Sequence, residues 1–553
     1  MLLSVNVTDK SFGDKVLYHD LRFDVQPGEK VGLVGRNGTG KSTLFNMITG
    51  GDTDFQGDIT VKKRAVVISS RQEHHGLDDS GVLEYIQGDL PEFAKLTHII
   101  DTYPAIMGDD VAKITVYSEA LERFGHLGYY QIEDEIAQLF EAYQLDPAKL
   151  HARMGDLSGG QKRMVELIKV QRSRGDLALI DEPTNHMDYV AKEAFIKWLA
   201  PAPEAVLVIT HDRDVLQHVD RIIEIRNGQA YAFRGNYGQY LKTNSNRVSS
   251  EVNEYDLTQR RIANLRDDVV RFRRMKEKAR DPGTIHRFKS QEQKAEAELE
   301  RLELVEQPSF WIDQESVGEL NTKMTDAYQK YKAKNIHLDA RHDAARSSRL
   351  LVQVDKLSLG YEGKALFTDV SFQLREGERL RLHGRNGAGK TTLVDAIMAA
   401  ANPRLPPAAS QRLAGTLAVE RELPVGHYQQ EIDEKYLPLT LYAALEGMLR
   451  DKDQPVSDQR IRQLLSNYLF TPNDGEMPLS QLSGGQKARF QLINMLANNP
   501  LLLILDEPTN HLDLPSIEEL ERAMQTYHGA VIYISHDSYF AKKLGGTTVA
   551  IGS

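Results

Sequence analysis

Two stretches of the chain, beginning at Gly35 and Gly384, have residue types and a spacing suited to holding phosphate groups. They read GRNGTGKST and GRNGAGKTT, and each follows a short segment typical of a strand. In the pattern G-x-x-x-x-G-K-[S/T] the glycines let backbone N–H groups point at an anion, the lysine reaches the outer phosphate oxygens, and the hydroxyl binds Mg²⁺. A glycine turn before a helix is the plain structural alternative, and two matches in one chain disfavour it. The residues expected to contact the ligand are Gly35, Asn37, Gly38, Gly40, Lys41, Ser42 and Thr43 in the first stretch and Gly384, Asn386, Gly387, Gly389, Lys390, Thr391 and Thr392 in the second.

The hexapeptide DEPTNH also occurs twice, and each copy closes an apolar run. A buried parallel strand that delivers carboxylates at its carboxyl end reads in this way. The first carboxylates, Asp181 and Asp506, are placed to hold Mg²⁺ through water. The second, Glu182 and Glu507, are placed to polarise the attacking water. Positioning and charge neutralisation are what phosphoryl transfer needs, so the two motifs together predict that reaction.

A histidine follows a second apolar strand in each half of the chain, His211 after AVLVIT and His536 after AVIYIS. Such a histidine is usually structural, but in register with the other motifs it is placed to sense a terminal phosphate. The stretch LSGGQK occurs at Leu157 and Leu482, and the same 325-residue offset relates the hexapeptides and the histidines. The chain is therefore an internal repeat whose two halves must position equivalent sites.

The halves differ in length between the glycine stretch and LSGGQK, because the glycine stretches are 349 residues apart. Equivalent glutamines are Gln72 and Gln430, with Gln429 as an alternative for the second. The additional residues of the first half lie at about 91–124. They form either a surface elaboration without function or a helical arm that contacts a partner.

The ordered set of glycine loop, glutamine, LSGGQ, acidic strand end and histidine resembles the ATP-binding-cassette ATPases over both halves. In that family the LSGGQ signature of one cassette covers the nucleotide held by the other, so the resemblance implies two composite sites for ATP and Mg²⁺. It implies adenine stacking on Phe12 and Tyr361, for which an ordinary strand-end aromatic is the alternative. The implied signature contacts are Ser158, Gly159, Gly160, Gln161, Ser483, Gly484, Gly485 and Gln486. The implied catalytic residues are Glu182, Glu507, His211, His536, Gln72 and Gln430, and the implied Mg²⁺ ligands are Ser42, Gln72, Asp181, Thr391, Gln430 and Asp506.

Composition narrows the class of protein. The 553 residues exceed a single core, and the absence of cysteine excludes disulfides and thiolate metal sites. No apolar run approaches the length that spans a bilayer, and the start of the chain does not read as a signal peptide. A net charge of −11 argues against a surface that coats nucleic acid, although a local basic patch remains compatible with it.

Residues 242–349, between the halves, are too many for a passive connection. Apolar residues at Ile262, Leu265, Val269, Phe272 and Met275 recur at helical spacing, and DPGT at 281–284 interrupts the pattern. Two antiparallel helices with a tip at Pro282–Gly283 are the simplest structure. Basic residues concentrate near this tip, which favours contact with RNA phosphates over the usual interpretation of a solvated helix face. The basic residues are Arg271, Arg273, Arg274, Lys276, Lys278, Arg280, Arg287 and Lys289.

Two fused cassettes with DEPTNH in both and a long charged linker resemble the ABC-F family. The predicted fold class is α/β, with two P-loop ATP-binding cassettes (1–241 and 350–553) in tandem, joined by a long α-helical hairpin. The resemblance implies a cytoplasmic, monomeric ATP hydrolase. It implies that the protein binds ribosomal RNA and tRNA on the ribosome through linker and arm, as a translation factor or an antibiotic-resistance protein. The alternatives are the ATPase subunit of a membrane transporter and a binding scaffold without turnover.

Overall fold

The computed structural model describes residues 1–12, 15–70, 77–185, 187–303, 349–361, 364–402, 410–429 and 432–552. Among these, residues up to Tyr237 and from 349 onward belong to one compact unit, which holds both halves of the repeat. Residues 238–303 belong to a second unit. None of the helices in the described part of the chain combines the length and the apolar character needed to cross a membrane. Gln72 and Gln430 lie outside the described residues, as do residues 304–348 of the expected linker.

The described residues of the first cassette form two sheets. A three-stranded antiparallel sheet has the order β2-β1-β4, with β1 at Leu3–Phe12, β2 at Lys15–Val25 and β4 at Gln56–Val61. A six-stranded sheet has the order β5-β6-β7-β3-β8-β9, parallel except for the antiparallel pair β8 and β9. Its strands span Val67–Ser69 (β5), Leu177–Asp181 (β6), Ala205–Ile209 (β7), Lys30–Gly35 (β3), Arg221–Arg226 (β8) and Gln229–Arg234 (β9). Strands β6 and β7 are buried along their whole length, because central parallel strands are covered on both faces.

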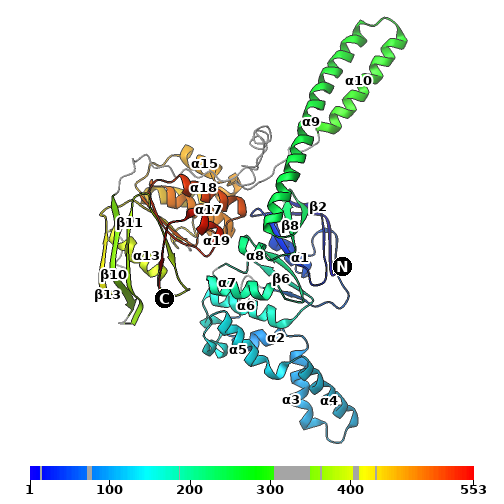
Figure 1. Cartoon of the computed structure of the whole chain (residues 1–553). Helices are drawn as coiled ribbons and strands as arrows, with labels where there is room; N and C mark the ends of the chain where they lie inside the picture. Colours follow the sequence, from blue (N-terminus) through cyan, green and yellow to red (C-terminus); the bar gives the residue numbers. More distant parts are fainter. Residues whose placement is uncertain are drawn as a thin grey trace. The chain divides into compact units, whose positions relative to one another are not determined.

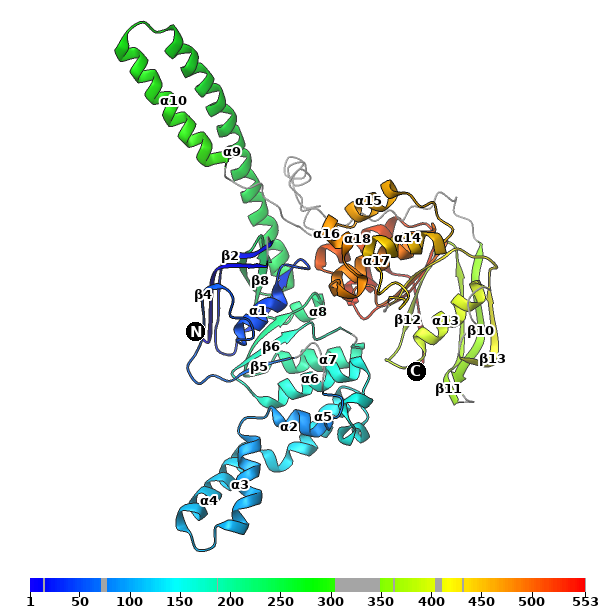
Figure 2. The ribbon, with the colours of Figure 1, turned by 180° about the vertical axis from the view of Figure 1, so that it is seen from behind.

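The helices of the first cassette include two that fall on the predicted insertion. Helices α3 (Phe93–Ile106) and α4 (Val111–His126) lie side by side, as both views show (Figures 1 and 2). The rings of Phe93, Phe124 and Tyr129 pack at their base with centroids 5.2 to 5.8 Å apart. The other helices are α1 (Lys41–Ile48), α2 (Val82–Gly88), α5 (Ile132–Ala142), α6 (Gly159–Ser173), α7 (Tyr189–Leu199) and α8 (Arg213–Leu216), with 3-10 turns η1 (Tyr129–Gln131), η2 (Pro147–His151) and η3 (Met154–Asp156).

The second cassette repeats this plan. Its antiparallel sheet has the order β11-β10-β13, with strands at Lys364–Arg375, Leu350–Tyr361 and Gln411–Val419. Its parallel sheet has the order β14-β15-β16-β12-β17, with strands at Val425–Tyr428, Leu502–Asp506, Ala530–Ile534, Arg379–His383 and Thr547–Ala550. The helices are α13 (Lys390–Ala401), α14 (Leu441–Asp451), α15 (Asp458–Asn467), α16 (Pro472–Glu476), α17 (Gly484–Leu496), α18 (Leu514–Thr526) and α19 (Ser538–Leu544), with the 3-10 turn η4 (Leu479–Gln481).

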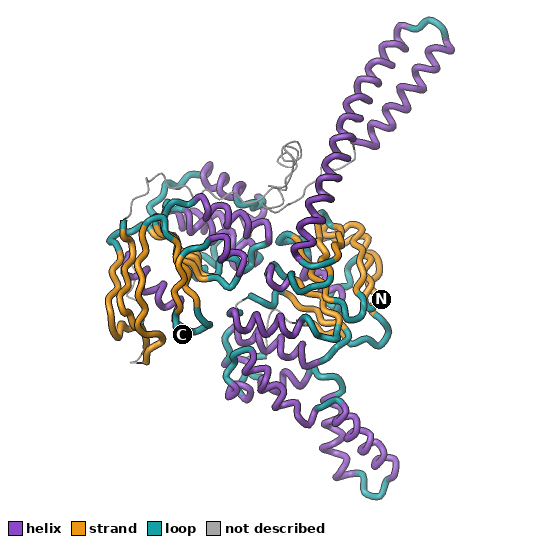
Figure 3. Tube along the Cα trace, viewed as in Figure 1, coloured by secondary structure: helices purple, strands orange, loops and turns teal. Residues whose placement is uncertain are grey.

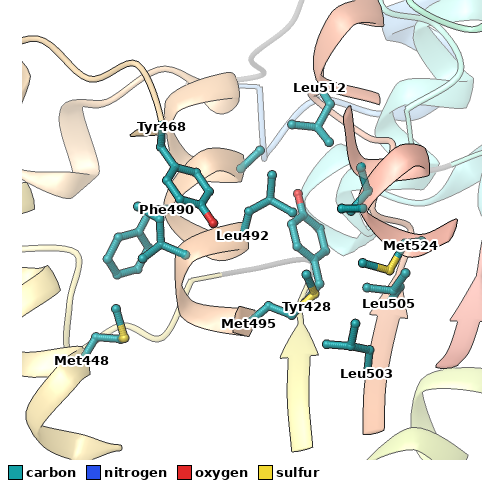
Figure 4. Close-up of a cluster of buried hydrophobic side chains, with 14 of the residues drawn as sticks. Tyr428, Met448, Tyr468, Phe490, Leu492, Met495, Leu503, Leu505, Leu512 and Met524 are labelled. Carbon is teal, nitrogen blue, oxygen red and sulfur yellow. The ribbon is translucent and has the colours of Figure 1, made fainter. Parts of the chain in front are cut away.

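A buried apolar cluster fixes the signature helix of the second cassette to its sheet. Phe490 and Leu492 of α17 belong to the same core as Leu503 and Leu505 of β15 (Figure 4). All four side chains are fully buried. Each such side chain contributes about 1.5–3 kcal/mol through burial, so the helix that begins at LSGGQ and the strand that ends at Asp506 move as one body.

The linker forms a helical hairpin of α9 (Tyr237–Lys278) and α10 (Pro282–Glu303), which Figure 3 shows as two long adjacent helices. Leu265, Val269 and Ala295 are buried between them. Met275 departs from the predicted seam, since its side chain is 42% exposed. The predicted tip also differs, because Pro282 and Gly283 belong to the first turn of α10 rather than to the connection. The carboxylate of Asp281 accepts hydrogen bonds from the backbone N–H and hydroxyl of Thr284, and a proline is well tolerated directly after such a cap.

Candidate nucleotide-binding sites

Each glycine loop connects a central strand to a helix and depends on glycine at its last position. Gly40 precedes α1 with φ of 91°, and Gly389 precedes α13 with φ of 95°. A Cβ at Gly40 would come within 2.5 Å of the Tyr18 hydroxyl, and one at Gly389 within 2.8 Å of the Phe367 ring. The positive φ and the close neighbours together require glycine. The loop therefore directs backbone N–H groups toward the start of the helix, where an anion binds.

The loop lysines are buried and bonded to the loop backbone. Lys41 Nζ donates to the carbonyls of Gly35 (2.8 Å) and Arg36 (3.1 Å). Lys390 Nζ donates to those of Gly384 and Arg385, both at 2.8 Å. Burial lowers the pKa of both lysines, while the nearby carboxylate of Glu182 or Glu507 acts in the opposite direction. Each site thus places an ammonium group beside a carboxylate.

A hydroxyl of each glycine loop is paired with the carboxylate that ends the neighbouring strand. The hydroxyl of Thr391 donates to Asp506 Oδ2 at 3.1 Å, and the Ser42 side chain bonds Asp181. Burial raises the pKa of both aspartates, and the hydroxyl contact opposes this rise. No group of three or more His, Cys, Asp or Glu side chains that would hold a metal by itself occurs among the described residues. A hydroxyl and one carboxylate per site fit Mg²⁺, which is commonly bound through one or two carboxylates together with substrate phosphates.

The two glutamates adopt a strained backbone conformation. Glu182 has φ of 45° and Glu507 has φ of 47°, in the left-handed region that costs a non-glycine residue about 1–3 kcal/mol. The following β-strand holds each in place, because Glu182 N–H donates to the carbonyl of Ile209 (2.8 Å) and Glu507 N–H to that of Ile534 (3.0 Å). Such strain is concentrated at functional sites.

Burial controls the protonation of these glutamates. It raises the pKa of Glu182 to about 8 and that of Glu507 to about 7, with the adjacent aspartate as the second cause. A carboxyl group whose pKa lies near neutrality is suited to accept a proton.

A histidine faces each glutamate. His211 Nε2 lies 3.6 Å from Glu182 Oε1, and His536 Nε2 lies 3.3 Å from Glu507 Oε1. Burial lowers the pKa of both histidines to about 3, so both rings are neutral at pH 7. Neither ring nitrogen of His211 or His536 has a hydrogen-bond partner within the described ranges. Buried polar atoms without partners are costly, and a phosphate oxygen and an ordered water would satisfy them.

The LSGGQ motifs form the first turns of α6 and α17. Ser158 and Ser483 are the N-cap residues, and each forms a reciprocal capping box with the glutamine three positions later, Gln161 or Gln486. The glutamine side chains that were expected to contact the nucleotide therefore hydrogen-bond the backbone of their own serine (3.1 and 2.9 Å). The free N–H groups of the helix start remain available to an anion.

In each cassette, residues at the end of the DEPTNH hexapeptide or just after it are hydrogen-bonded to the glycine loop of the other cassette. The backbone N–H of Asn37 donates to Asp513 Oδ2 (3.0 Å), and its side chain donates to the carbonyl of His511 (2.8 Å). A Cβ on Gly485 would lie 2.0 Å from Asn37 Nδ2, so the signature glycine packs directly on the loop. In the other direction, the N–H of Asn386 donates to Asp188 Oδ2 at 3.2 Å.

A cavity of about 1150 Å³ unites these elements. Among the predicted site residues, those that line it are Asn37, Gly38, Gly40, Lys41, Ser42, Thr43, Ser158, Gly159, Gly160, Asp181, Glu182, His211, Asn386, Gly387, Gly389, Lys390, Thr391, Thr392, Ser483, Gly484, Gly485, Asp506, Glu507 and His536. Phe12 and Tyr361 do not line it. They lie at the ends of β1 and β10, with 53% and 44% of their side chains exposed.

Sequence reasoning missed Asp188 and Asp513. Each uses one carboxylate oxygen to cap the helix that follows it, α7 or α18, and the other oxygen to accept an N–H from the opposite glycine loop. The sequence did contain a signal for these two aspartates, because both follow a hexapeptide and the repeat offset of 325 residues relates them.

Both cassettes match a family model and have relatives among known proteins. A family model described as "ABC transporter" matches residues 18–185 and 367–510, and a second model with the same description matches residues 223–317. The energy-dependent translational throttle protein EttA of Mycobacterium tuberculosis (strain ATCC 25618 / H37Rv) is 29% identical over 543 residues, which are 96% of this chain and 88% of that protein. ABC transporter F family member 5 of Arabidopsis thaliana is 28% identical over 551 residues, which are 98% of this chain and 74% of that protein.

The fold is shared with an archaeal ribosome recycling factor, aABCE1, solved in complex with an archaeal ribosomal stalk protein. The TM-score is 0.57 at 16% sequence identity, over 99% of this chain and 87% of that one. At this identity the likeness concerns the fold alone. The prediction of an α/β protein with two tandem cassettes joined by a helical hairpin is confirmed.

Proposed function

This chain belongs to the ABC-F family of the ATP-binding-cassette ATPases, and from that premise we propose that it is an ATP hydrolase acting on the ribosome. In this proposal ATP closes the cassettes, the closed form binds the ribosome, and hydrolysis releases it. The hairpin and the arm contact ribosomal RNA and tRNA, with the hairpin directed toward the peptidyl-transferase region. The protein acts as a cytoplasmic monomer whose two cassettes form an intramolecular pair. A translation-factor role is favoured by the name of its relative EttA, a translational throttle protein.

The observation that supports ATP-dependent closure most strongly is the bonding of Asn37 to the opposite cassette. Its N–H and side chain meet Asp513 and His511, next to Gly485 of the signature. A nucleotide in the glycine loop of the first cassette therefore lies against residues of the second. Binding energy is released only when both cassettes engage it, which makes closure depend on ATP.

Within each site the residues divide the work. Lys41 and Lys390 neutralise the outer phosphates, and the helix N-terminus beyond each glycine loop binds them through N–H groups. Mg²⁺, held by Ser42 with Asp181 or by Thr391 with Asp506, would supply charge neutralisation at the phosphates. Glu182 and Glu507 orient the attacking water and accept its proton. His211 and His536 present a neutral ring nitrogen to the terminal phosphate. Gln72 and Gln430 keep their proposed role at the Mg²⁺ site.

A ribosome-pelleting experiment tests this function. The protein is sedimented with ribosomes in the presence of ADP, ATP or a nonhydrolysable ATP analogue. We expect the analogue to give the largest bound fraction, because it closes the cassettes and blocks release. Binding that is absent with all three nucleotides would contradict the proposal and favour the alternative of a transporter ATPase subunit. Protection of a translation extract from a drug directed at the peptidyl-transferase centre would assign the antibiotic-resistance role instead.

A further inference from the structure

A lysine of the first cassette reaches the catalytic histidine of the second. Lys192 lies in α7 and is buried, and its Nζ donates to the backbone carbonyl of His536 at 2.6 Å. The backbone N–H of His536 donates in turn to Glu507 Oε2 at 3.3 Å. The backbone of His536 is therefore held on one side by the glutamate of its own cassette and on the other by the opposite cassette.

The ammonium group of Lys192 is itself fixed by two carboxylates. It lies 2.5 Å from Asp214 Oδ2 and 3.4 Å from Asp212 Oδ2, both of the first cassette. Asp214 also accepts a hydrogen bond from the hydroxyl of Ser538, two residues beyond His536. Removing one member of such a buried network leaves an uncompensated charge, so the group resists rearrangement.

A second ion pair supports the same junction. Arg213 is buried and donates to Glu521 (2.6 Å) and Asp537 (2.9 Å), both of the second cassette. Asp537 directly follows His536. The segment that carries the histidine of the second site is thus held by side chains of the first cassette at several points.

Among the described residues, no lysine of the second cassette reaches the backbone carbonyl of His211, although Asp212 and Arg213, which follow His211, belong to the same ion-pair network. By the 325-residue offset of the repeat, Lys192 corresponds to Ile517 and Tyr189 to Leu514. Ile517 is buried and apolar, so its side chain has no donor for the carbonyl of His211. The ring of Tyr189, by contrast, lies tilted against two histidines of the second cassette, with its centroid 4.7 Å from that of His383 and 6.4 Å from that of His536.

We propose that Lys192 is a positioning residue chiefly for the second ATP site, so that the two sites are unequal in how they depend on the opposite cassette. The inference rests on the function proposed above. Lys192 sets the position of His536, and through it the geometry around Glu507, only when the first cassette is docked. The first site, with Ile517 at this place, turns over without such a contact. The rate of hydrolysis in the second site therefore depends on whether the first cassette is docked on the second.

The test separates the sites by mutation. Glu182→Gln leaves only the second site able to hydrolyse, and Glu507→Gln leaves only the first. Lys192→Met is added to each background, and single-turnover hydrolysis is measured with protein in excess over radiolabelled ATP, so that product release does not limit the signal. We expect a roughly ten- to hundredfold lower rate in the Glu182→Gln background, as for a displaced catalytic group. ATP affinity should be unchanged. The rate in the Glu507→Gln background should fall much less, because there Lys192 contacts only the side chain of Asp212, next to His211, among the described residues.

Two further variants make the result specific. Lys197→Met removes a lysine from the exposed face of the same helix and should change neither rate, since among the described residues Lys197 pairs with Glu193 on the surface and with no other carboxylate. Lys192→Arg keeps the charge and the donors, and we expect it to restore part of the lost rate. Should Lys192→Met unfold the protein in a melting experiment, Tyr189→Leu, which copies the residue of the other half and leaves no buried charge, takes its place. A smaller loss confined to the second site is then expected.

Equal losses in both backgrounds, or no loss in either, would overturn the proposal. Failure of the underlying function gives a different result, namely no hydrolysis by the unaltered protein at either site.

Discussion

Glu182 and Glu507 have the clearest chemical role, that of accepting a proton from the attacking water. Their burial, their backbone strain and their position after a buried strand all support it. Both follow a buried strand, both have a positive φ, and both have a pKa raised to near neutrality by burial. The hexapeptide alone was enough to single them out. The strain was not readable from the sequence, because a positive φ at glutamate is imposed by the turn that leads from the strand to the following helix and not by the residue itself.

Replacing both residues, Glu182→Gln and Glu507→Gln, tests their role. The amide keeps the size of the side chain but no longer accepts a proton, so hydrolysis should fall by about 10²–10⁴-fold. ATP affinity should remain, because the glycine loops and lysines are intact. The measurement is phosphate release together with binding of a fluorescent ATP analogue. Normal hydrolysis, or loss of nucleotide binding, would show that the assigned role is wrong. The doubly substituted protein should also accumulate on ribosomes when ATP is present.

At the scale of elements, the sequence predicted which segments of the two cassettes meet. It did not predict which of their residues come into contact. The glycine loops, signature helices and strand ends were all readable from motifs, and the resemblance implied that they pair across the cassettes. Spacing within one half does not reveal contacts between halves, so the approach of Gly485 to Asn37 and the roles of Asp188 and Asp513 appear only in three dimensions. Met275 departed from the predicted seam, because two successive steps of three residues from Val269 turn its side chain about 120° away on a helix of 3.6 residues per turn.

Gly485→Ala tests the packing of the signature on the glycine loop. The added Cβ would lie 2.0 Å from Asn37 Nδ2, so the Asn37 side chain must leave its hydrogen bond to His511. At about 1–1.5 kcal/mol for such a bond, closure at the first site should weaken about five- to tenfold. Alanine favours a helix over glycine, so loss of folding is not the expected cause. The measurement is single-turnover hydrolysis in the Glu507→Gln background.

Gly447→Ala is the matched control, because it makes the same change inside α14, where the nearest atom to the new Cβ is 3.7 Å away. Its hydrolysis rate should equal that of the parent. An unchanged rate for Gly485→Ala would count against the head-to-tail pairing of the cassettes.

At the scale of the whole molecule, the helical hairpin is an element whose role does not follow from ATP binding and hydrolysis by the two cassettes. The sequence predicted the hairpin and its basic end, but treated the eight basic residues as one patch. The structure divides them. Arg273 and Lys276 pair with Glu292 and Glu296 of the second helix, so their charge is already compensated. Arg271 pairs with Asp268. The partners of Arg273 and Lys276 lie outside the 271–289 window, and only the register of two helices brings them close.

Arg274 and Lys278, in contrast, are exposed and form no ion pair within the described residues. If the hairpin meets RNA phosphates, these two release counterions on binding, and affinity falls with salt in proportion to the number of contacts. Changing both to Gln should reduce the slope of log affinity against log salt by about 1.4–1.8.

The control variant changes Arg273 and Lys276 to Gln, again one arginine and one lysine. Its slope should move much less, because Glu292 and Glu296 already neutralise these side chains. Helix content, followed by circular dichroism, checks that the control hairpin stays folded. Binding of all three proteins to ribosomes is measured from about 50 to 300 mM salt. Equal slopes for the parent and the Arg274, Lys278 variant would mean that this face of the hairpin is only solvated and that the proposed contact with RNA is wrong.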